Sequence, residues 1–151
     1  QAFDLIGRKM GLHMGRLLRR FFHPVQGLID AHMAHPTLSD LVMNLAKGFA
    51  KLQQATALIA QKGMKDPEEG AAAATDYLRL FALVAMGYMW VRMSVVASDK
   101  LNAGGLSPDR AAFYTEKIKT ARFFFDRMFP EYEFRFRAAM SGKDSTMATS
   151  L

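Results

Sequence analysis

Histidine is the main candidate metal ligand in this sequence, which contains four histidines and no cysteine. His32 and His35 stand three residues apart, a spacing at which two side chains on one helix can share a metal. No third strong ligand is near them, so an exposed helix end is the favoured interpretation. Without cysteine the chain has no disulfide, no thiolate metal site and no cysteine nucleophile. We predict no metal-binding residue.

His23 opens the stretch "HPVQG" and suggests a second kind of chemistry. The stretch resembles histidine phosphotransfer domains, which are helical bundles that present a His followed by Lys-Gly at about this spacing. Gly27 fits that pattern, whereas Gln26 stands where a lysine would help to hold phosphate, and Pro24 would disturb the helix. A helix-breaking His-Pro is therefore the favoured interpretation. A free-standing helical interaction or histidine-phosphotransfer module stays open as the alternative function.

Two arginines, Arg79 and Arg92, lie in the most apolar segment, where a buried guanidinium would need a partner. Asp76, three residues before Arg79, is the expected partner of that residue. No carboxylate is close to Arg92 in the sequence, so we expect it to reach another helix or an interface. The sequence shows no Ser/His/Asp set, no paired-carboxylate site and no glycine-rich phosphate loop. We therefore predict no catalytic residue and no cofactor-binding residue.

Methionine and phenylalanine supply most of the other distinctive side chains. Met86, Met89 and Met93 are expected to fill the core, because methionine adapts to irregular gaps. The three phenylalanines at 123–125 cover too much of a helix circumference to be buried on one face, which predicts contacts on two sides and hence a partner. The alternating Phe and Arg side chains at 134–137 would not share one helical face. They are therefore a poor platform for nucleic acid, and we expect no nucleic-acid partner.

Half of the 151 residues are hydrophobic, 23% are charged, and the net charge is +6. This composition is typical of one folded domain. Residues 1–24 carry five cations and one carboxylate, a local charge of +4. Such an excess could attract phosphate or anionic lipid, but more often it is a solvated face or one that meets an acidic neighbour. The cations are Arg8, Lys9, Arg16, Arg19 and Arg20, against Asp4.

The uncharged apolar run at 81–91 is much shorter than the ~20 residues needed to cross a bilayer. It predicts a buried helix and no transmembrane segment. The amphipathic, charged N-terminal segment does not resemble a signal peptide. We expect a cytoplasmic protein, and the absence of cysteine is consistent with this expectation.

The positions of proline, glycine and capping residues divide the chain into helices and show no strand pattern. The fold class expected is all-α, an antiparallel four-helix bundle of long helices, with the first helix broken near Pro24. Thr37 and Asp40 form a capping box at the start of the second helix, and Gly63 is expected just past its end.

The third and fourth helices have clearer boundaries. Asp66 is the expected N-cap of the third helix, followed by Pro67 in its first turn. This helix is apolar nearly all round, so we expect it to be central, and Gly104–Gly105 should end it. Ser107 is the expected cap of the fourth helix, which Pro130 should bend.

Gly7, Gly11 and Gly15 recur every four residues in the first segment. On one helix they would form a stripe where another backbone approaches closely; the alternative is that the segment is less helical. The helical pattern from the second or third residue predicts that the chain begins inside a longer helix and is the tail of a larger protein.

Three stretches resemble one enzyme family. "QAFDLIGRK" is similar to the segment that follows the Tyr-Glu-Gly-Thr motif of flavin-dependent acyl-CoA dehydrogenases, with Gln1, Gly7, Arg8 and Lys9 matching. "DYLRLFALVAMGYMWVRM" and "AAFYTEKIKTARFFFDRMFPE" resemble the extra C-terminal helical domain of a bacterial subgroup. That subgroup includes methylmercaptopropionyl-CoA dehydrogenase-type enzymes.

The resemblance implies a parent enzyme that uses FAD to oxidise acyl-CoA to 2-enoyl-CoA. The general base of the family would precede Gln1, so the fragment alone is expected to be inactive and to bind no FAD. The implied partners are the catalytic domains of the same polypeptide and a homodimer partner. Residues 1–34 would end the dehydrogenase bundle, 35–142 would form the extra domain, and 143–151 would be a flexible tail. The implied role is structural and dimer-stabilising.

Overall fold

The computed structural model describes residues 1–12 and 15–147. Seven α-helices and one π-helix account for most of these residues, and no strand occurs among them. In chain order the elements are α1 (Ala2–Asp4), the π-helix η1 (Leu5–Lys9), α2 (Arg16–His32), α3 (Ser39–Lys65), α4 (Pro67–Ala103), α5 (Pro108–Arg127), α6 (Glu131–Met140) and α7 (Asp144–Met147). The predicted all-α class is confirmed, whereas the predicted count of four helices is not.

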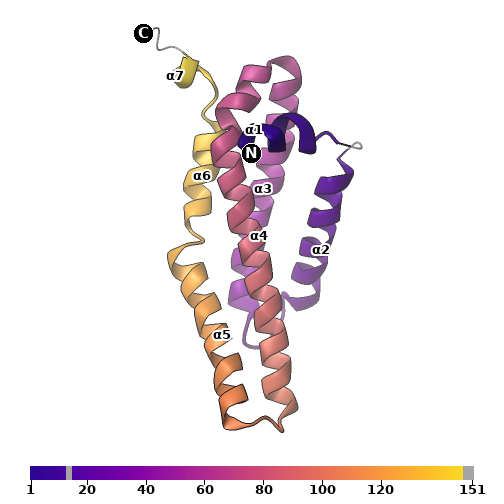
Figure 1. Ribbon diagram of the computed structural model, residues 1–151, viewed down its shortest axis with the longest axis vertical. Coiled ribbons are helices and arrows are strands. Elements are labelled where there is room, and N and C mark those ends of the chain that lie inside the picture. The colour runs from indigo at the N-terminus through magenta and orange to yellow at the C-terminus, as the bar shows by residue number, and fades with distance from the viewer. Residues whose placement is uncertain (13–14, 148–151) are drawn as a thin grey trace.

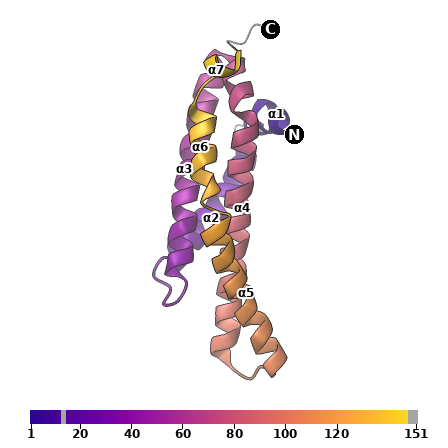
Figure 2. The same ribbon diagram turned by 90° about the vertical axis from the view of Figure 1, so that its left-hand side faces the viewer.

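The long helices lie side by side along one axis, and successive ones run in opposite directions (Figure 1). Helix α4 is central, because it contacts α3, α5, α6 and the N-terminal segment α1–η1. Helix α2 packs on α3. The α4–α5 hairpin extends beyond the α2–α3 loop, so its tip is only two helices thick (Figure 2). The central position predicted for this helix is confirmed.

The capping residues account for the boundaries of α4 and α5. The Asp66 carboxylate accepts a hydrogen bond from the Glu68 backbone N–H at 3.0 Å, and Pro67 follows as the first helical residue. Ser107 Oγ accepts from the Arg110 N–H at 3.4 Å. Gly104 and Gly105 have φ of +71° and +70°, which L side chains rarely adopt, so the chain turns there. These boundary predictions are confirmed.

The predicted capping box of the second helix is wrong. Helix α3 begins at Ser39 with Leu38 as its N-cap and no side-chain cap hydrogen bond. The Asp40 carboxylate instead pairs with Arg122 of α5, whose guanidinium also donates to the Thr37 carbonyl at 2.7 Å. Gly63 does not end the helix, which continues to Lys65. The Asp40 carboxylate therefore forms a long-range ion pair and does not take part in capping α3.

The predicted break at Pro24 is also wrong, because α2 runs through it from Arg16 to His32. Packing on both sides of the proline keeps the helix continuous. The Phe22 ring meets the Phe49 ring edge-on, with 5.3 Å between the ring centroids, and Val25 is fully buried. That packing offsets the hydrogen bond which proline cannot donate. The chain bends earlier, before α2, where Gly15 has φ of +75°.

The glycine stripe does not form, because its three members lie on different elements. Gly7 is in η1, Gly11 is in the turn after it, and Gly15 is the left-handed residue before α2. A Cβ added to Gly7 or Gly11 would meet nothing within 4 Å. The alternative of a less helical segment is therefore correct, and no backbone approaches these two glycines.

Close packing against glycine occurs instead at the break between α5 and α6. The sequence predicts that Pro130 bends the fourth helix, but the helix is divided there: α5 ends at Arg127, and Pro130 is the N-cap of α6. Phe129 lies in this break and is in the core, with 1% of its surface exposed. Its ring lies between Gly48 of α3 and Gly87 of α4. A Cβ on Gly48 would lie 2.9 Å from Phe129 Cε1 and closer still to Cζ, and one on Gly87 would lie 3.0 Å from Cε2. The two glycines leave the space that this ring fills.

Helix α4 is also long and apolar enough to cross a membrane by length and composition. Its most apolar window has a mean hydropathy of 1.7, and 44% of that window is buried within the protein. A core helix surrounded by other helices has the same properties, and α4 is such a helix.

Candidate functional site

The histidines considered as candidates for metal binding and phosphotransfer do not gather into a site. The His32 and His35 rings lie 6.1 Å apart, and no group of three His, Cys, Asp or Glu side chains that could hold a metal occurs in the described residues. His23 is exposed on α2. The neighbouring Gln26 amide donates to Asp30 at 2.8 Å, so it is directed along its own helix.

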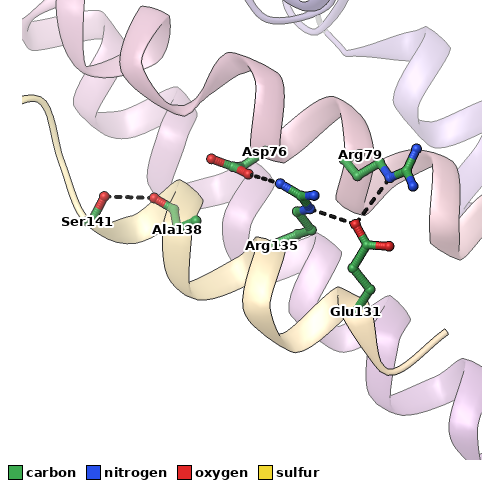
Figure 3. Close-up of polar contacts among 6 residues, drawn as sticks. All are labelled: Asp76, Arg79, Glu131, Arg135, Ala138 and Ser141. Carbon is green, nitrogen blue, oxygen red and sulfur yellow. Dashed lines mark hydrogen bonds and ion pairs between the residues drawn. The ribbon is translucent and has the colours of Figure 1, made fainter. Parts of the chain in front are cut away.

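The densest polar cluster joins α4 to α6 (Figure 3). Arg135 donates from Nη1 to Asp76 Oδ1 and from Nε to Glu131 Oε1, each at 2.8 Å. Arg79 Nε donates to the same Glu131 oxygen at 3.2 Å. The predicted Asp76–Arg79 pair is thus wrong, because Asp76 pairs with Arg135 and Arg79 pairs with Glu131. Two cations and two carboxylates make the cluster neutral.

These contacts make Glu131 a poor proton acceptor. The Arg135 guanidinium, followed by that of Arg79, holds the pKa of Glu131 below its ordinary value of 4.5. A general base for chemistry near neutral pH needs a pKa close to that range. The cluster therefore fixes α6 against α4 and has no catalytic capacity of this kind.

The stabilising effect of Glu131 should depend on pH. Because the pKa of its carboxyl is lower in the folded chain, its contribution is complete above pH 4.5 and is lost as the pH falls through the folded-state value. We expect Glu131→Gln to melt at a lower temperature than the native chain near neutral pH. The gap between the two melting temperatures should close as the pH falls from 4.5 through the lower folded-state pKa.

A matched substitution tests whether this pH dependence belongs to the interhelical cluster. Glu116→Gln removes an exposed ion pair with Lys119 within α5. The difference in melting temperature between this variant and the native chain should therefore be smaller at every pH. A Glu131→Gln gap that persisted unchanged in acid would contradict the assignment.

A second ion cluster joins the chain near its C-terminus to the start of α4. Lys143 Nζ lies 2.5 Å from an Asp66 oxygen and 2.7 Å from a Glu68 oxygen. The carboxylates raise the pKa of Lys143, and the lysine, together with the Glu68 N–H, lowers the pKa of Asp66. Lys143 is the first residue of the predicted flexible tail, so that segment is connected to the helical core at its start.

The exposed α4–α5 tip carries an apolar groove of about 320 Å³. Its walls include Met89 and Val96 of α4 and Phe113 of α5, which have 48%, 54% and 55% of their surfaces exposed. Met86 is 43% exposed on the same helix. The prediction that these methionines fill the core is wrong for Met86 and Met89, which lie on an exposed side of α4, whereas Gly87 between them faces Leu45 of α3. Met93 is partly buried.

Cations border the same groove. Arg92 lies over the Tyr88 ring at 5.4 Å, and Lys117 lies over the Phe113 ring at 5.3 Å. Arg92 is exposed and makes no ion pair with the described residues. Among the described residues no ion pair joins it to another helix, and the alternative that it reaches an interface stays a prediction.

A cavity of about 480 Å³ lies beneath the N-terminal segment, between η1, α2, α3 and the start of α4. Its walls are mainly apolar side chains and glycines; Thr56 is its polar side chain. The Thr56 hydroxyl already lies 2.7 Å from the Leu52 carbonyl and 2.8 Å from the Tyr77 hydroxyl. Among the described residues, the side chains that line the cavity offer no cation and no unbonded donor for an anionic ligand.

The phenylalanines at 123–125 divide between two environments. Phe124 and Phe125 are buried, whereas Phe123 is 60% exposed. The prediction that this run cannot be buried on one face is confirmed.

The Glu131–Arg135 part of the ion cluster between α4 and α6 could have been found from its i,i+4 spacing. Asp76 could not, because 59 residues separate it from Arg135.

These features define an all-helical domain that has ion clusters between helices and an exposed apolar groove. Residues 21–150 match the family described as acetyl-CoA dehydrogenase C-terminal like. The match covers most of the chain, which therefore belongs to this family. A comparison with curated proteins finds no match.

Proposed function

We propose that this chain is the C-terminal helical domain of an FAD-dependent acyl-CoA dehydrogenase. The parent enzyme would oxidise acyl-CoA to 2-enoyl-CoA in the cytoplasm. The observation that carries this proposal is the family match over residues 21–150. The finer assignment is to the bacterial subgroup that resembles methylmercaptopropionyl-CoA dehydrogenases, with the extra domain at 35–142 and the flexible tail at 143–151.

Within this enzyme the proposed role of the domain is structural. The carboxylates of the α4–α6 cluster are occupied by guanidinium groups, which suits holding helices together better than moving protons. If the domain is described as a four-helix bundle, its helices would be α2, α3, α4 and a fourth that consists of α5 and α6 together, with a break between them.

The FAD of the parent would be held by other residues. Its pyrophosphate needs hydrogen-bond donors or cations, and the described side chains that line the cavity beneath the N-terminal segment supply neither a cation nor an unbonded donor. We therefore derive no catalytic step from this domain, and we expect the chain alone to be colourless and inactive. No nucleic-acid partner and no membrane-spanning segment form part of the proposal.

The groove at the α4–α5 tip is the proposed packing surface for the homodimer partner. It has the apolar and aromatic composition that interface cores favour. We expect Met89→Glu in the enzyme that carries this domain to weaken dimerisation about tenfold or more, because a carboxylate would be buried against apolar side chains. Sedimentation equilibrium of the purified enzyme measures this change.

Met43→Glu is the matched control, because Met43 is 45% exposed on α3 and does not line the groove. It should leave the dimer and the flavin content unchanged. If both variants dimerised as strongly as the native enzyme, the proposed role of the groove in dimerisation would be wrong. A yellow, active preparation of the chain alone would contradict the structural role.

The phosphotransfer alternative has one supporting feature, the exposure of His23. The neighbouring Gln26 bonds to Asp30, and the family match points elsewhere. We therefore do not propose it as a second function.

A further inference from the structure

We propose that the outward face of α2 binds a protein surface rich in carboxylates. The face is formed by Arg16, Arg19, Arg20 and His23, which are all exposed in the first two turns of the helix. Their spacing of three, four and seven residues places them along one side. This inference is independent of the enzyme assignment and of the apolar groove.

The three arginines differ from most others in the described residues because they make no ion pair there. Five arginines elsewhere have carboxylate partners within the protein: Arg8, Arg79, Arg122, Arg135 and Arg137. Among the described residues no carboxylate lies within ion-pair distance of Arg16, Arg19 or Arg20. Their charges are therefore available to a partner.

The arrangement is also unfavourable for the isolated domain. Arg16 and Arg20 are like charges four residues apart, and they repel each other. No acidic residue lies in the first turn of α2, although the positive end of the helix dipole favours one there. A partner that brings carboxylates would relieve both effects.

The structure favours a protein partner over a membrane. The apolar side of α2 is already packed in the core, where the Phe21 ring stacks on Phe81 at 4.9 Å and Ile29 is 3% exposed. Leu17, at 37% exposed, is the large apolar side chain left beside the arginines. A surface-bound helix needs an apolar face to insert, and this one is occupied.

A nucleic acid also fits poorly, because the basic face is short. Beyond His23 the same side of α2 continues with Gln26, which is bonded to the carboxylate of Asp30. A polyanion binds along an extended track of cations. Three guanidinium groups within two turns match a compact group of carboxylates on a protein surface.

The test measures binding of a fluorescent poly-glutamate peptide to the whole chain at low salt. The triple variant Arg16→Gln, Arg19→Gln, Arg20→Gln should bind about tenfold more weakly, as expected for the loss of three exposed ion pairs. The control triple Lys47→Gln, Lys100→Gln, Arg127→Gln removes the same charge from exposed sites on other helices. It should lose about twofold or less, since only long-range attraction changes.

Competing probes decide between the classes of partner. Phosphatidylserine vesicles and duplex DNA should bind more weakly than the peptide, and stronger binding of either would overturn the proposal. So would equal losses in the two triple variants, or no binding of the peptide at all.

A stability measurement separates binding from a structural role. The α2 triple variant should melt at the same temperature as the native chain or higher at low salt, because it removes repulsion. A lower melting temperature would show that the arginines support the fold, and would overturn the proposal.

Discussion

Replacing Gly48 by alanine is expected to lower the free energy of unfolding by about 1–3 kcal/mol, the usual range for overpacking a tight core. Alanine normally stabilises a helix relative to glycine by about 1 kcal/mol. Here the added methyl would lie 2.9 Å from Phe129 Cε1 and closer still to Cζ, on a ring that is itself buried. Urea denaturation of both proteins measures the difference.

Gly27→Ala is the matched control, since Gly27 lies within α2 and a Cβ there would meet nothing within 4 Å. It should raise stability by about 0.5–1 kcal/mol. Shortening the ring with Phe129→Leu should recover part of the loss in the Gly48→Ala background, which a double-mutant cycle would detect. If Gly48→Ala stabilised the chain as Gly27→Ala does, the ring would not lie between α3 and α4.

The helix boundaries that could be predicted from the sequence are those set by local chemistry. Asp66 with Pro67 and Ser107 with Pro108 start α4 and α5 because a side-chain acceptor and a fixed φ act within a few residues. Gly104 ends α4 through its positive φ. Such signals need no knowledge of the rest of the fold.

Two of the wrong predictions share a cause, which is that tertiary contacts outweighed a local rule. Pro24 should break a helix, but the packing of Phe22 and Val25 keeps α2 continuous. Asp40 should support the start of α3, but Arg122 of a distant helix pairs with it. Neither contact can be found without the arrangement of the helices.

The candidate sites were harder to predict than the fold. Composition predicts Met89 in the core, yet its exposure depends on which side of α4 faces the other helices, and that side holds Gly87. The partner of Arg79 was expected three residues away, and it is Glu131, 52 residues later. The glycines that matter for packing, Gly48 and Gly87, do so because of a single ring inserted between two helices.

The second large effect is expected at Tyr77, a fully buried residue of α4. Tyr77→Ala should lower the free energy of unfolding by about 3–5 kcal/mol, as for other large aromatic deletions in cores. Its ring contacts Phe81 edge-on at 6.2 Å, and its hydroxyl lies 2.8 Å from Thr56 Oγ1 of α3. The residue therefore connects two helices by packing and by a hydrogen bond.

Tyr77→Phe separates these two contributions. It keeps the ring and should lose only about 0.5–1.5 kcal/mol, because Thr56 retains its bond to the Leu52 carbonyl. Burial raises the pKa of Tyr77 from 10.0 to about 12, so the neutral phenol stabilises the folded chain fully below pH 10. That contribution is lost as the pH rises toward 12.

Alkaline denaturation therefore gives a second measurement on the same pair of proteins. Between pH 10 and about 12 the native chain should lose more stability than Tyr77→Phe, so the gap between them narrows. A Tyr77→Phe loss as large as that of Tyr77→Ala would mean that the hydroxyl, and not the ring, holds α4 against α3. A gap independent of pH would mean that the hydroxyl is exposed to solvent.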